Sequence, residues 1–291
     1  MANQKRRLSD NAPGDFFVDE TCIDCGTCRE LAPDTFGDLA ASAYVYAQPS
    51  SPQAVRRALQ AVVCCPTGSI GSGRHAAKVA LGDFPMPITS DVFYCGFNAE
   101  ASYGAHSYFV RHPDGNWLID SPKYLARLVS WFAANGGVRY IFLSHQDDVA
   151  DAAKYAARFG ATRIIHRADA HAQPGAEILV EGYDPLPVGN RFTVVPVPGH
   201  TEGSCALLYD DRILFTGDHV WWNASEQRLA TSREVCWYSW EEQAESVARL
   251  QDYRFEWVLP GHGHRIHLAP ERMRAEIASL AERSRERVAK R

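Results

Sequence analysis

Four cysteines constrain the fold of this chain more than any other feature of its sequence. Cys22, Cys25 and Cys28 are each separated by two residues, and Cys65 lies further along the chain, where it precedes a proline. Thiolates at this spacing reach three corners of a cubane of iron and sulfide from one tight loop, and the distant thiolate closes the fourth corner. Gly26 relieves the crowding of the backbone against the sulfides, and the proline, which lacks an N–H, bends the chain away. The pattern predicts one 4Fe-4S cluster, and a 3Fe-4S form, after loss of one iron, stays open.

The segments around these cysteines resemble the single-cluster bacterial ferredoxins. VDETCIDCGTCRELAPDTF, followed by AVVCCPTGSI, is similar to the whole sequence frame of those proteins. Between the two segments, SPQAVRRALQAVV predicts a helix that delivers Cys65, with Ser51 as its N-cap and Pro52 at its first position. The resemblance implies an α+β ferredoxin-like domain over residues 1–80. The alternative is a zinc knot on the same four thiolates, although zinc sites usually pair one C-x2-C with another.

The expected cellular compartment and the net charge of the chain limit the kinds of partner that it can have. The charged start, MANQKRR, is not followed by an apolar segment, and no stretch of about 18 apolar residues occurs, so we expect a soluble, cytoplasmic protein. With a net charge of -5 at pH 7, we expect neither a nucleic acid nor a membrane as partner. We expect a small-molecule substrate and a redox partner protein. Thiols stay reduced in the cytoplasm, and the remaining cysteines are expected to be buried small hydrophobes. They are Cys64, Cys95, Cys205 and Cys236.

A second pattern begins after the glycine-rich segment GSGRHAAK (71–78), which fits a short connector. SYFVRHPDGNWLID predicts a hairpin that turns near Asp114 and Gly115. YLARLVSWFAANGG and DVADAAKYAARFG have a helical period, and the apolar segments VRYIFLS and TRIIH, which follow them in turn, predict strands. The order strand, helix, strand, helix predicts an α/β layer with a sheet inside.

Histidines and an aspartate follow the apolar strands of the second half. FTVVPVPGH predicts a strand and a loop that ends in His200, LFTGD a strand that ends at Asp218, and FEWVLPGHG a strand that delivers His262. A sheet that ends its strands in one layer of loops gathers such side chains at one edge. The sequence therefore predicts that these candidate ligands meet there.

The same motifs resemble those of the metallo-β-lactamase superfamily, with the hydroxyacylglutathione hydrolases as near relatives. PGH-T-x-G-S, LFTGD and LPGHG, preceded by LSH, are similar to its successive motifs. The resemblance implies an αββα sandwich with a metal centre at the sheet edge. We place this domain at residues 81–270 and a C-terminal helix at 271–291. The metal ligands that the resemblance implies are His145, His200, Asp218 and His262, with Asp218 bridging two metals where both are present.

The chain departs from the superfamily at its first motif. The segment 145–150 reads His-Gln-Asp-Asp-Val-Ala where the family has His-x-His-x-Asp-His. Asp147 replaces the second histidine, and a valine and an alanine, which cannot bind a metal, replace two ligands of the second metal. We therefore expect the second site to be empty or reorganised around Asp148 or Asp151.

The first metal site keeps His145, Asp147 and His200. Two imidazoles and one carboxylate suit non-haem iron(II) with open positions, so a mononuclear iron is favoured and manganese is an alternative. The flavodiiron proteins of the superfamily also carry a carboxylate at the second motif position, although they keep the later ligands. Zinc accepts the same donor set and is the other alternative.

Three functions fit this combination of sites. The first is an oxidoreductase in which the cluster serves electrons to the mononuclear metal, because a hydrolase has no use for electrons. The second is a hydrolase of the thioester or lactone type, with Asp218 or Asp147 as general base and a structural or sensing cluster. Val149 weakens the second, because the carboxylate that it replaces commonly orients the attacking water. The third is an electron carrier whose second domain docks a partner through the tryptophan-rich segment 221–240. That segment is also expected to form a lid over the metal pocket, with Arg233, Trp237 and Tyr238 lining it.

Overall fold

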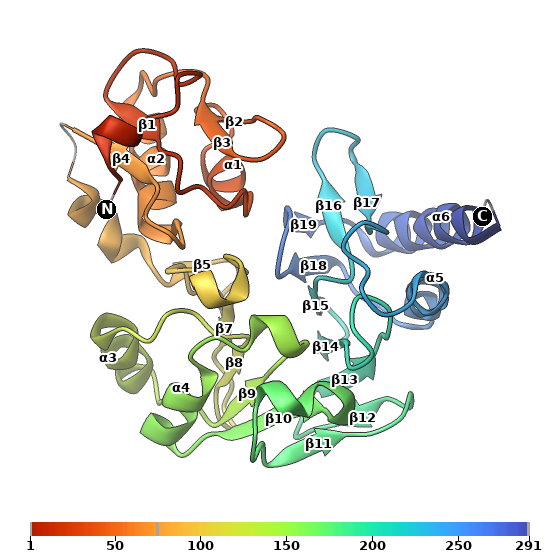
Figure 1. Ribbon diagram of the computed structural model, residues 1–291. Helices are drawn as coiled ribbons and strands as arrows, with labels where there is room; N and C mark the ends of the chain where they lie inside the picture. Colours follow the sequence, from red (N-terminus) through yellow and green to blue (C-terminus); the bar gives the residue numbers. More distant parts are fainter. Residues whose placement is uncertain (1, 74–75, 290–291) are drawn as a thin grey trace.

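The computed structural model of the chain describes residues 2–73 and 76–289 and shows a smaller N-terminal domain and a larger two-sheet domain (Figure 1). Two antiparallel strand pairs and two helices build the smaller domain. The strand pairs are β1 (Phe16–Val18) with β4 (Ile70–Ser72), and β2 (Phe36–Asp38) with β3 (Ala43–Val45). The helices are α1 (Thr27–Leu31) and α2 (Pro52–Cys64), preceded by the 3-10 turn η1 (Gln4–Arg6).

Helix α2 starts where the sequence predicts. The Ser51 hydroxyl accepts a hydrogen bond from the Ala54 N–H over 3.1 Å, and Pro52 occupies the first helical position. Leu59 lies on the buried face of α2 and joins Phe16 in a small core, to which the Cys28 side chain also belongs. The cysteine loop is therefore part of the hydrophobic core of this domain.

A mixed sheet of seven strands forms the first half of the larger domain, in the order β11-β10-β9-β8-β7-β6-β5. Its strands are β5 (Met86–Pro87), β6 (Val92–Tyr94), β7 (Tyr108–Val110), β8 (Trp117–Ile119), β9 (Tyr140–Phe142), β10 (Thr162–His166) and β11 (Ile178–Val180). Strands β7 and β8 form the hairpin predicted around Asp114 and Gly115, and β8, β9, β10 and β11 run parallel. The two predicted helices are α3 (Ala126–Ala134) and α4 (Ala152–Phe159).

A second sheet, of six strands, has the order β12-β13-β14-β15-β18-β19. Its strands are β12 (Leu186–Pro187), β13 (Phe192–Pro196), β14 (Cys205–Tyr209), β15 (Ile213–Gly217), β18 (Trp257–Pro260) and β19 (Ile266–His267). The remaining strands and helices are the hairpin β16 (Trp221–Asn223) and β17 (Arg228–Ala230), and the helices α5 (Trp240–Arg249) and α6 (Pro270–Ala289). Short 3-10 turns complete the chain: η2 (Ala77–Asp83), η3 (Glu100–Ser102), η4 (Gln146–Asp148), η5 (Arg167–Ala172) and η6 (Leu250–Asp252).

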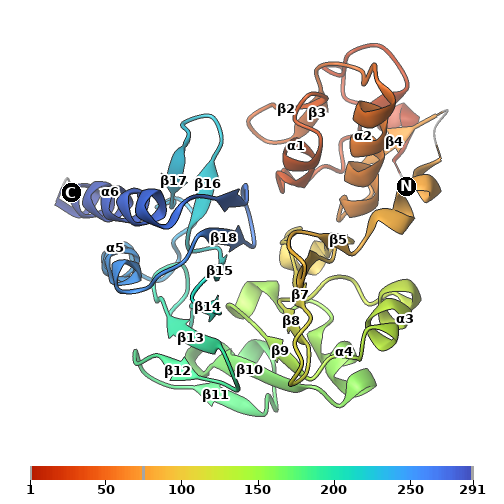
Figure 2. The ribbon, with the colours of Figure 1, turned by 180° about the vertical axis from the view of Figure 1, so that it is seen from behind.

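The two sheets pack face to face with helices outside both. Helices α3 and α4 lie on the outer side of the first sheet, and α5 and α6 on the outer side of the second (Figures 1 and 2). Between the sheets, the Trp117 ring stacks on Phe192 with centroids 4.1 Å apart, and Phe192 stacks on Tyr209. Under the outer helices, Val247 of α5 and Ile277 of α6 pack on Leu214 of β15. This is the αββα sandwich that the sequence predicts.

The connector differs in its structure from the prediction. The segment 71–78 begins as strand, because Gly71 and Ser72 pair with β1, and it ends in η2. Arg74 and His75 of the predicted connector, and residues 1, 290 and 291 of the predicted domains, lie outside the described residues. Helix α6 starts at Pro270. In the described part of the chain, no helix has the length and apolar character that crossing a membrane requires.

The two domains meet at the loop between β6 and β7. The Asn98 side chain donates to the Thr27 hydroxyl over 3.1 Å and to the Gly104 carbonyl over 2.6 Å. The Thr27 hydroxyl in turn donates to the same carbonyl over 3.3 Å. On the other side, the Lys123 ammonium donates to the Pro66 carbonyl over 2.6 Å. The residues that follow the cysteine ligands are thus bound directly to the larger domain.

Candidate cluster and metal sites

The four predicted cluster cysteines line one small cavity in the N-terminal domain, with Val18, Ile70 and Pro66 among its walls. They are Cys22, Cys25, Cys28 and Cys65. Asp24 and Gly26 adopt left-handed backbone angles, with φ of 59° and 81°, which fold the loop tightly enough for its thiols to converge. Gly26 is the residue type that such a turn favours.

The thiols of this cavity fit an iron–sulfur cluster. Burial, helped by the charges of the nearby Cys65 and Cys22, raises the pKa of Cys25 to about 11, although two hydrogen bonds with Thr27 act against the shift. Thiols crowded in this way lose their protons when a metal binds, because the bound cation offsets the cost of burying the thiolates and their mutual repulsion. Backbone N–H groups already aim at sulfur: Ala43 at Cys22 over 3.4 Å and Ser69 at Cys65 over 3.3 Å. Such donors are typical of cluster sites.

The other cysteines lie outside this cavity. Cys64, Cys95 and Cys205 are buried, as predicted, and burial raises the pKa of Cys64 to about 12. Cys236 is only half-buried, and its thiol donates a hydrogen bond to the Gly199 carbonyl over 3.1 Å.

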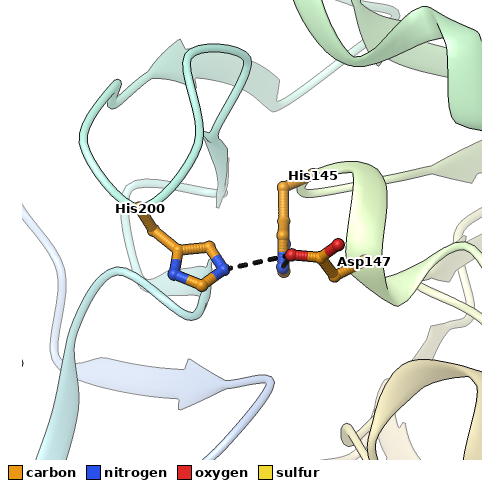
Figure 3. A group of neighbouring side chains, drawn as sticks. All are labelled: His145, Asp147 and His200. Atoms are coloured by element: carbon orange, nitrogen blue, oxygen red, sulfur yellow. Dashed lines mark ion pairs between the residues drawn. The ribbon is translucent and has the colours of Figure 1, made fainter. Parts of the chain in front are cut away.

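The predicted metal ligands come from loops at one edge of the sandwich. His145 and Asp147 stand on the turn after β9, His200 in the loop between β13 and β14, Asp218 at the end of β15 and His262 after β18. Figure 3 shows the Asp147 carboxylate pointing toward the His200 ring, close to His145. The strand ends therefore bring together side chains that are far apart in the sequence.

The donor atoms converge at distances that suit a metal. The Asp147 Oδ2 lies 3.5 Å from the His200 Nε2 and 3.8 Å from the His145 Nε2. The Asp218 Oδ2 lies 3.8 Å from both of these nitrogens and 3.9 Å from the His262 Nε2. Ligands held about 2.1 Å from one metal ion stand roughly 3 to 3.5 Å apart, so a small contraction around an ion completes the site.

Buried atoms without partners support a metal at this place. Within residues 2–73 and 76–289, the Nε2 atoms of His145 and His200 and the Oδ1 of Asp218 are buried and accept or donate no hydrogen bond. Buried polar atoms nearly always have a partner, and a cation supplies one to all three. The other ring nitrogens are fixed from behind: the His145 Nδ1 by the Ser144 hydroxyl over 2.9 Å, and the His200 Nδ1 by the Val235 carbonyl. These contacts turn both Nε2 atoms into the site.

Electrostatics separate the two imidazoles. Burial lowers the pKa of His145 below its ordinary value, although Asp218 and Asp147 act against the shift. Burial also lowers the pKa of His200, but the Asp147 carboxylate 3.5 Å from its Nε2 and the charge of Asp218 outweigh it, so the net shift is upward. The nearby His200 imidazole in turn lowers the pKa of Asp147. Asp147 is therefore a carboxylate at neutral pH, ready to bind a cation.

Of the two residues named for a reorganised second site, Asp148 faces the metal centre and Asp151 does not. Asp148 forms a second group of potential ligands with His145 and Asp218, and its buried Oδ2 has no hydrogen-bond partner among the described residues. A Cβ at Gly261 would lie 2.7 Å from both the Asp148 Oδ2 and the Asp218 Oδ1, so glycine leaves room for these two carboxylates. The Asp151 carboxylate instead accepts the Tyr124 N–H over 2.7 Å.

Asp120 is a buried acid near this centre that the motifs did not single out. Its carboxylate accepts the Ser144 N–H over 2.8 Å and so fixes the backbone just before His145. Burial raises its pKa to about 7, and the Asp218 charge adds to the shift. The position after the apolar strand WLI, shared with Asp218 after its own strand, is the signal that could have pointed to it.

The three residues expected to line the metal pocket lie in different places. Trp237 lies on the wall of the metal-site cavity, as expected for a lid residue, whereas Arg233 lines a separate groove beside the β16–β17 hairpin. Tyr238 is attached through its backbone, since its N–H donates to the carbonyls of Gly199 and His200, and its side chain is exposed. The segment 221–240 thus reaches the metal site at its start and near its end.

One cavity of about 1090 Å³ opens onto both candidate sites. The cysteine loop contributes Cys25 and Gly26 to its wall, and the metal centre contributes Asp147, His200 and Asp218. Gly104, at the bottom of the domain interface, packs so closely that a Cβ there would lie 2.7 Å from the Cys25 Cβ. A molecule in this cavity is in reach of both sites at once.

Comparisons with known proteins agree with this division of the chain. Residues 18–72 match the family described as the 4Fe-4S single cluster domain of ferredoxin I. Over 116 residues the chain is 28% identical to a hydroxyacylglutathione hydrolase of Acidiphilium cryptum, a match that covers 39% of this chain and 48% of the relative. The chain thus spans about half the length of that curated relative.

Solved structures show the fold of the larger domain. The metallo-β-lactamase FIM-1 from Pseudomonas aeruginosa, in its mono-zinc form, superposes with a TM-score of 0.52 at 17% identity, covering 68% of this chain and 94% of that chain. A metallo-β-lactamase from Pontibacter korlensis gives a TM-score of 0.50 at 19% identity, covering 68% of this chain and 97% of that chain. Both resemblances stated from the sequence, the ferredoxin type and the metallo-β-lactamase fold, are confirmed.

Proposed function

We propose that this chain, in which a 4Fe-4S ferredoxin-type domain is joined to a metallo-β-lactamase fold, is an oxidoreductase whose cluster serves electrons to a mononuclear iron. A small-molecule substrate would react at the iron, and a redox partner protein would supply the electrons. The observation that carries the proposal is the shared cavity, which is walled by the cysteine loop and by the metal-facing side chains. Two redox sites that open onto the same space can act on the same molecule.

The loop between β6 and β7 supports electron transfer between the sites. Gly104 contacts Cys25 on one side, and the ring of its neighbour Tyr103 lies 6.1 Å from the ring of His262 on the other. The hydrogen bonds from Thr27 and Asn98 to the Gly104 carbonyl hold this loop in place. A short and rigid segment of protein therefore connects a cluster ligand to a side chain of the metal centre.

The donor set favours iron. His145, Asp147 and His200 offer two imidazoles and a carboxylate, the combination that suits non-haem iron(II) with open positions, and Asp218 adds a second carboxylate. Iron held there would supply one-electron chemistry to the substrate. Zinc, one of the two alternative metals, would supply Lewis acidity alone. Manganese is the other alternative. The Asp147 side chain is 50% exposed, so its carboxylate can also accept a proton from a molecule in the cavity.

A hydrolase of the thioester or lactone type is the second candidate, and the similarity to a hydroxyacylglutathione hydrolase favours it. Hydrolysis needs a carboxylate that orients the attacking water, and the cavity wall next to Asp147 carries Val149 and Ala150 instead. Asp148 is a weaker candidate for that carboxylate, because burial holds its pKa well above the ordinary value. The third candidate, an electron carrier with a docking domain, leaves the converging ligands unused.

Metal analysis of anaerobically purified protein tests the proposal. We expect iron in excess of the iron–sulfur cluster, and a paramagnetic signal of that iron which changes when the protein takes up single electrons. The variant Cys65→Ala is the control, because it lacks the cluster. The mononuclear iron of this variant should no longer be reduced by an electron donor that acts through the cluster. Zinc in place of mononuclear iron contradicts the proposal and leaves the hydrolase.

A further inference from the structure

The shared cavity has a wall composition that selects its ligand. Two exposed aromatic rings stand beside the metal centre. Trp237 is 66% exposed and lies 6.2 Å from the His200 ring, and Tyr103 is 57% exposed and lies 6.1 Å from the His262 ring. Exposed apolar side chains that gather around one hollow mark a candidate contact surface for another molecule. Both rings line the shared cavity, and each adjoins a metal-facing imidazole.

Part of the cavity wall near the metal centre is apolar. Val149 and Ala150 line the cavity directly after Asp147 and Asp148, and Val235, which is 40% exposed, lies near Trp237 on the same cavity. Apolar groups there offer a ligand no hydrogen bond, and they gain most from contact with a hydrocarbon or aromatic surface.

The charged groups of the wall are almost all acidic. The acidic residues are Asp24, Glu30, Glu100, Asp147, Asp148 and Asp218. Among the described residues of the wall, Arg29 is the only lysine or arginine, and it is engaged by Asp24 over 2.5 Å and by Asp38 over 3.6 Å. No free cation is therefore available to pair with a carboxylate, sulfonate or phosphate of a ligand.

The two cofactors do not reverse this balance. A divalent metal is matched by the carboxylates of Asp147 and Asp218, and the four thiolates of the cluster add negative charge behind the Cys25 loop. Glu100 stands exposed on η3 and adds a further carboxylate to the wall. An anion that enters meets net repulsion on its path.

We propose that this cavity binds an uncharged or cationic ligand that carries an aromatic ring system. The inference rests on the proposed function and deepens it, because such a ligand is the substrate class that the shared cavity would present to both redox sites. Binding alone is claimed, so the test requires no electron transfer.

Three naphthalene probes that differ in charge test the ligand class on the metal-loaded full chain. They are 2-naphthalenemethanol, which is neutral, 2-naphthylmethylammonium, a cation, and naphthalene-2-sulfonate, an anion. We expect calorimetric titration to show binding of the first two and at least about tenfold weaker binding of the sulfonate, which corresponds to about 1.4 kcal/mol. Equal or tighter binding of the sulfonate, or no binding of any probe, overturns the proposal.

Variants of two wall residues separate the aromatic and the electrostatic parts. Trp237→Ala should weaken all three probes roughly tenfold, whereas Trp237→Phe, which keeps a ring, should stay within about threefold of the parent. The control is Tyr46→Ala, which removes a ring that is 47% exposed and lies outside the cavity wall. Because the Trp237 side chain is mostly exposed, its loss should leave folding and metal content unchanged. An unaffected titration in Trp237→Ala contradicts the aromatic part.

Charge reversal at Glu100 tests the electrostatic part. Glu100→Lys should abolish most of the discrimination against the sulfonate, and Glu286→Lys, the same change on the exposed face of α6, should leave it intact. A gap that survives Glu100→Lys, or closes equally in Glu286→Lys, contradicts the electrostatic part. The outcomes stay distinguishable from those of the proposed function. A protein that binds zinc and follows the expected order of probe affinities contradicts the redox role and supports the ligand class. A protein that binds mononuclear iron and does not follow that order supports the redox role and contradicts the ligand class.

Discussion

The cluster site and the metal site are built in opposite ways. Three of the four cluster thiols belong to the short segment 22–28, and the fourth follows helix α2, whose N-cap is Ser51. The metal-facing side chains instead come from four separate loops of two packed sheets, between His145 and His262. Short-range spacing specifies the first site, and the tertiary fold specifies the second.

The two sites also differ in their relation to the hydrophobic core. Cys28 is itself a core residue of the N-terminal domain, and Cys22 and Cys65 pack against the same small core. The larger domain has two extensive cores, in which rings such as Trp117 and Phe192 pack, and its metal-facing residues lie outside both. Because small domains bury too little apolar surface to be very stable, we expect the cluster to hold its domain together and the metal to bind a domain that is already stable.

The largest expected effect comes from replacing Cys65, whereas the same replacement of the neighbouring Cys64 should have little effect. Cys65→Ala should abolish the cluster and unfold residues 2–73, while residues 76–289 stay folded, because only the smaller core includes cluster ligands. Cys64→Ala is the matched control, since Cys64 is buried outside the cluster cavity and its variant should keep a full cluster. Acid-labile sulfide and segment-resolved hydrogen exchange measure both. Simultaneous unfolding of the two domains would show that the comparison is wrong.

Loss of a carboxylate at the metal centre should change metal affinity and leave stability almost unchanged. We expect Asp218→Ala and Asp147→Ala to weaken metal binding on the order of 100-fold, read from the metal retained against a competing chelator. The metal-free larger domain should be no less stable in Asp218→Ala, because Asp218 adds repulsion to the buried carboxyls of Asp120 and Asp148. Glu100→Gln, on the same wall, is the control and should retain the metal. Full metal content in Asp147→Ala removes Asp147 from the ligand set.

Gly104→Ala probes the contact that links the two sites. The residue has a φ of +89°, and its Cβ would lie 2.7 Å from the Cys25 Cβ, so we expect a loss of roughly 2–3 kcal/mol in the unfolding free energy of the N-terminal domain. Gly182→Ala is the control for the backbone alone, with a φ of +69° and nothing within 4 Å of the new Cβ, and should cost about 1 kcal/mol. Denaturant unfolding, followed by the cluster absorbance for Gly104→Ala and by tryptophan fluorescence of the larger domain for Gly182→Ala, gives the two losses. Equal losses in both variants would show that the contact is unimportant.

The smallest effect concerns acid stability far from the metal. The Asp91 carboxylate accepts the Tyr209 hydroxyl over 2.7 Å and the Arg212 guanidinium over 3.2 Å. Burial raises the pKa of Asp91, but these partners and Thr89 outweigh it and the net shift is downward. A depressed pKa stabilises the fold above the unfolded value of about 3.9 and loses that contribution as the pH falls through the folded value. Asp91→Asn should cost about 1 kcal/mol at pH 7 and progressively less as the pH falls below about 3.9, measured as the melting temperature of the larger domain. A cost that does not decline below this pH contradicts this account.

The sequence was most informative where a feature is local. The cysteine spacing, the Ser51 cap and the turn at Asp114 and Gly115 depend on a few adjacent residues, and the structure has all three as predicted. The domain bounds at residues 80 and 270 and the assignment of ligands to a metal stay predictions. The strand ends at His200 and Asp218 could be located because apolar segments stop there.

Features that depend on packing between distant segments could not be predicted. The contact of Gly104 with Cys25, the common cavity and the orientation of Asp148 toward Asp218 each join parts of the chain far apart in sequence. Asp151 was an equal candidate to Asp148 in the sequence, and only the backbone N–H of Tyr124, which binds the Asp151 carboxylate, separates the two. No local pattern encodes that choice.

The position of Gly104 has a consequence for biosynthesis. Translation proceeds from the N-terminus, so the ribosome completes all four cluster cysteines well before the loop that will cover Cys25 exists. In this interval the nascent thiols are open to the machinery that delivers iron and sulfide. Once the second domain has folded, the backbone at Gly104 lies against Cys25, and the thiol then faces only the shared cavity. The order in which the polypeptide is made thus offers an interval for cofactor loading before the domains dock.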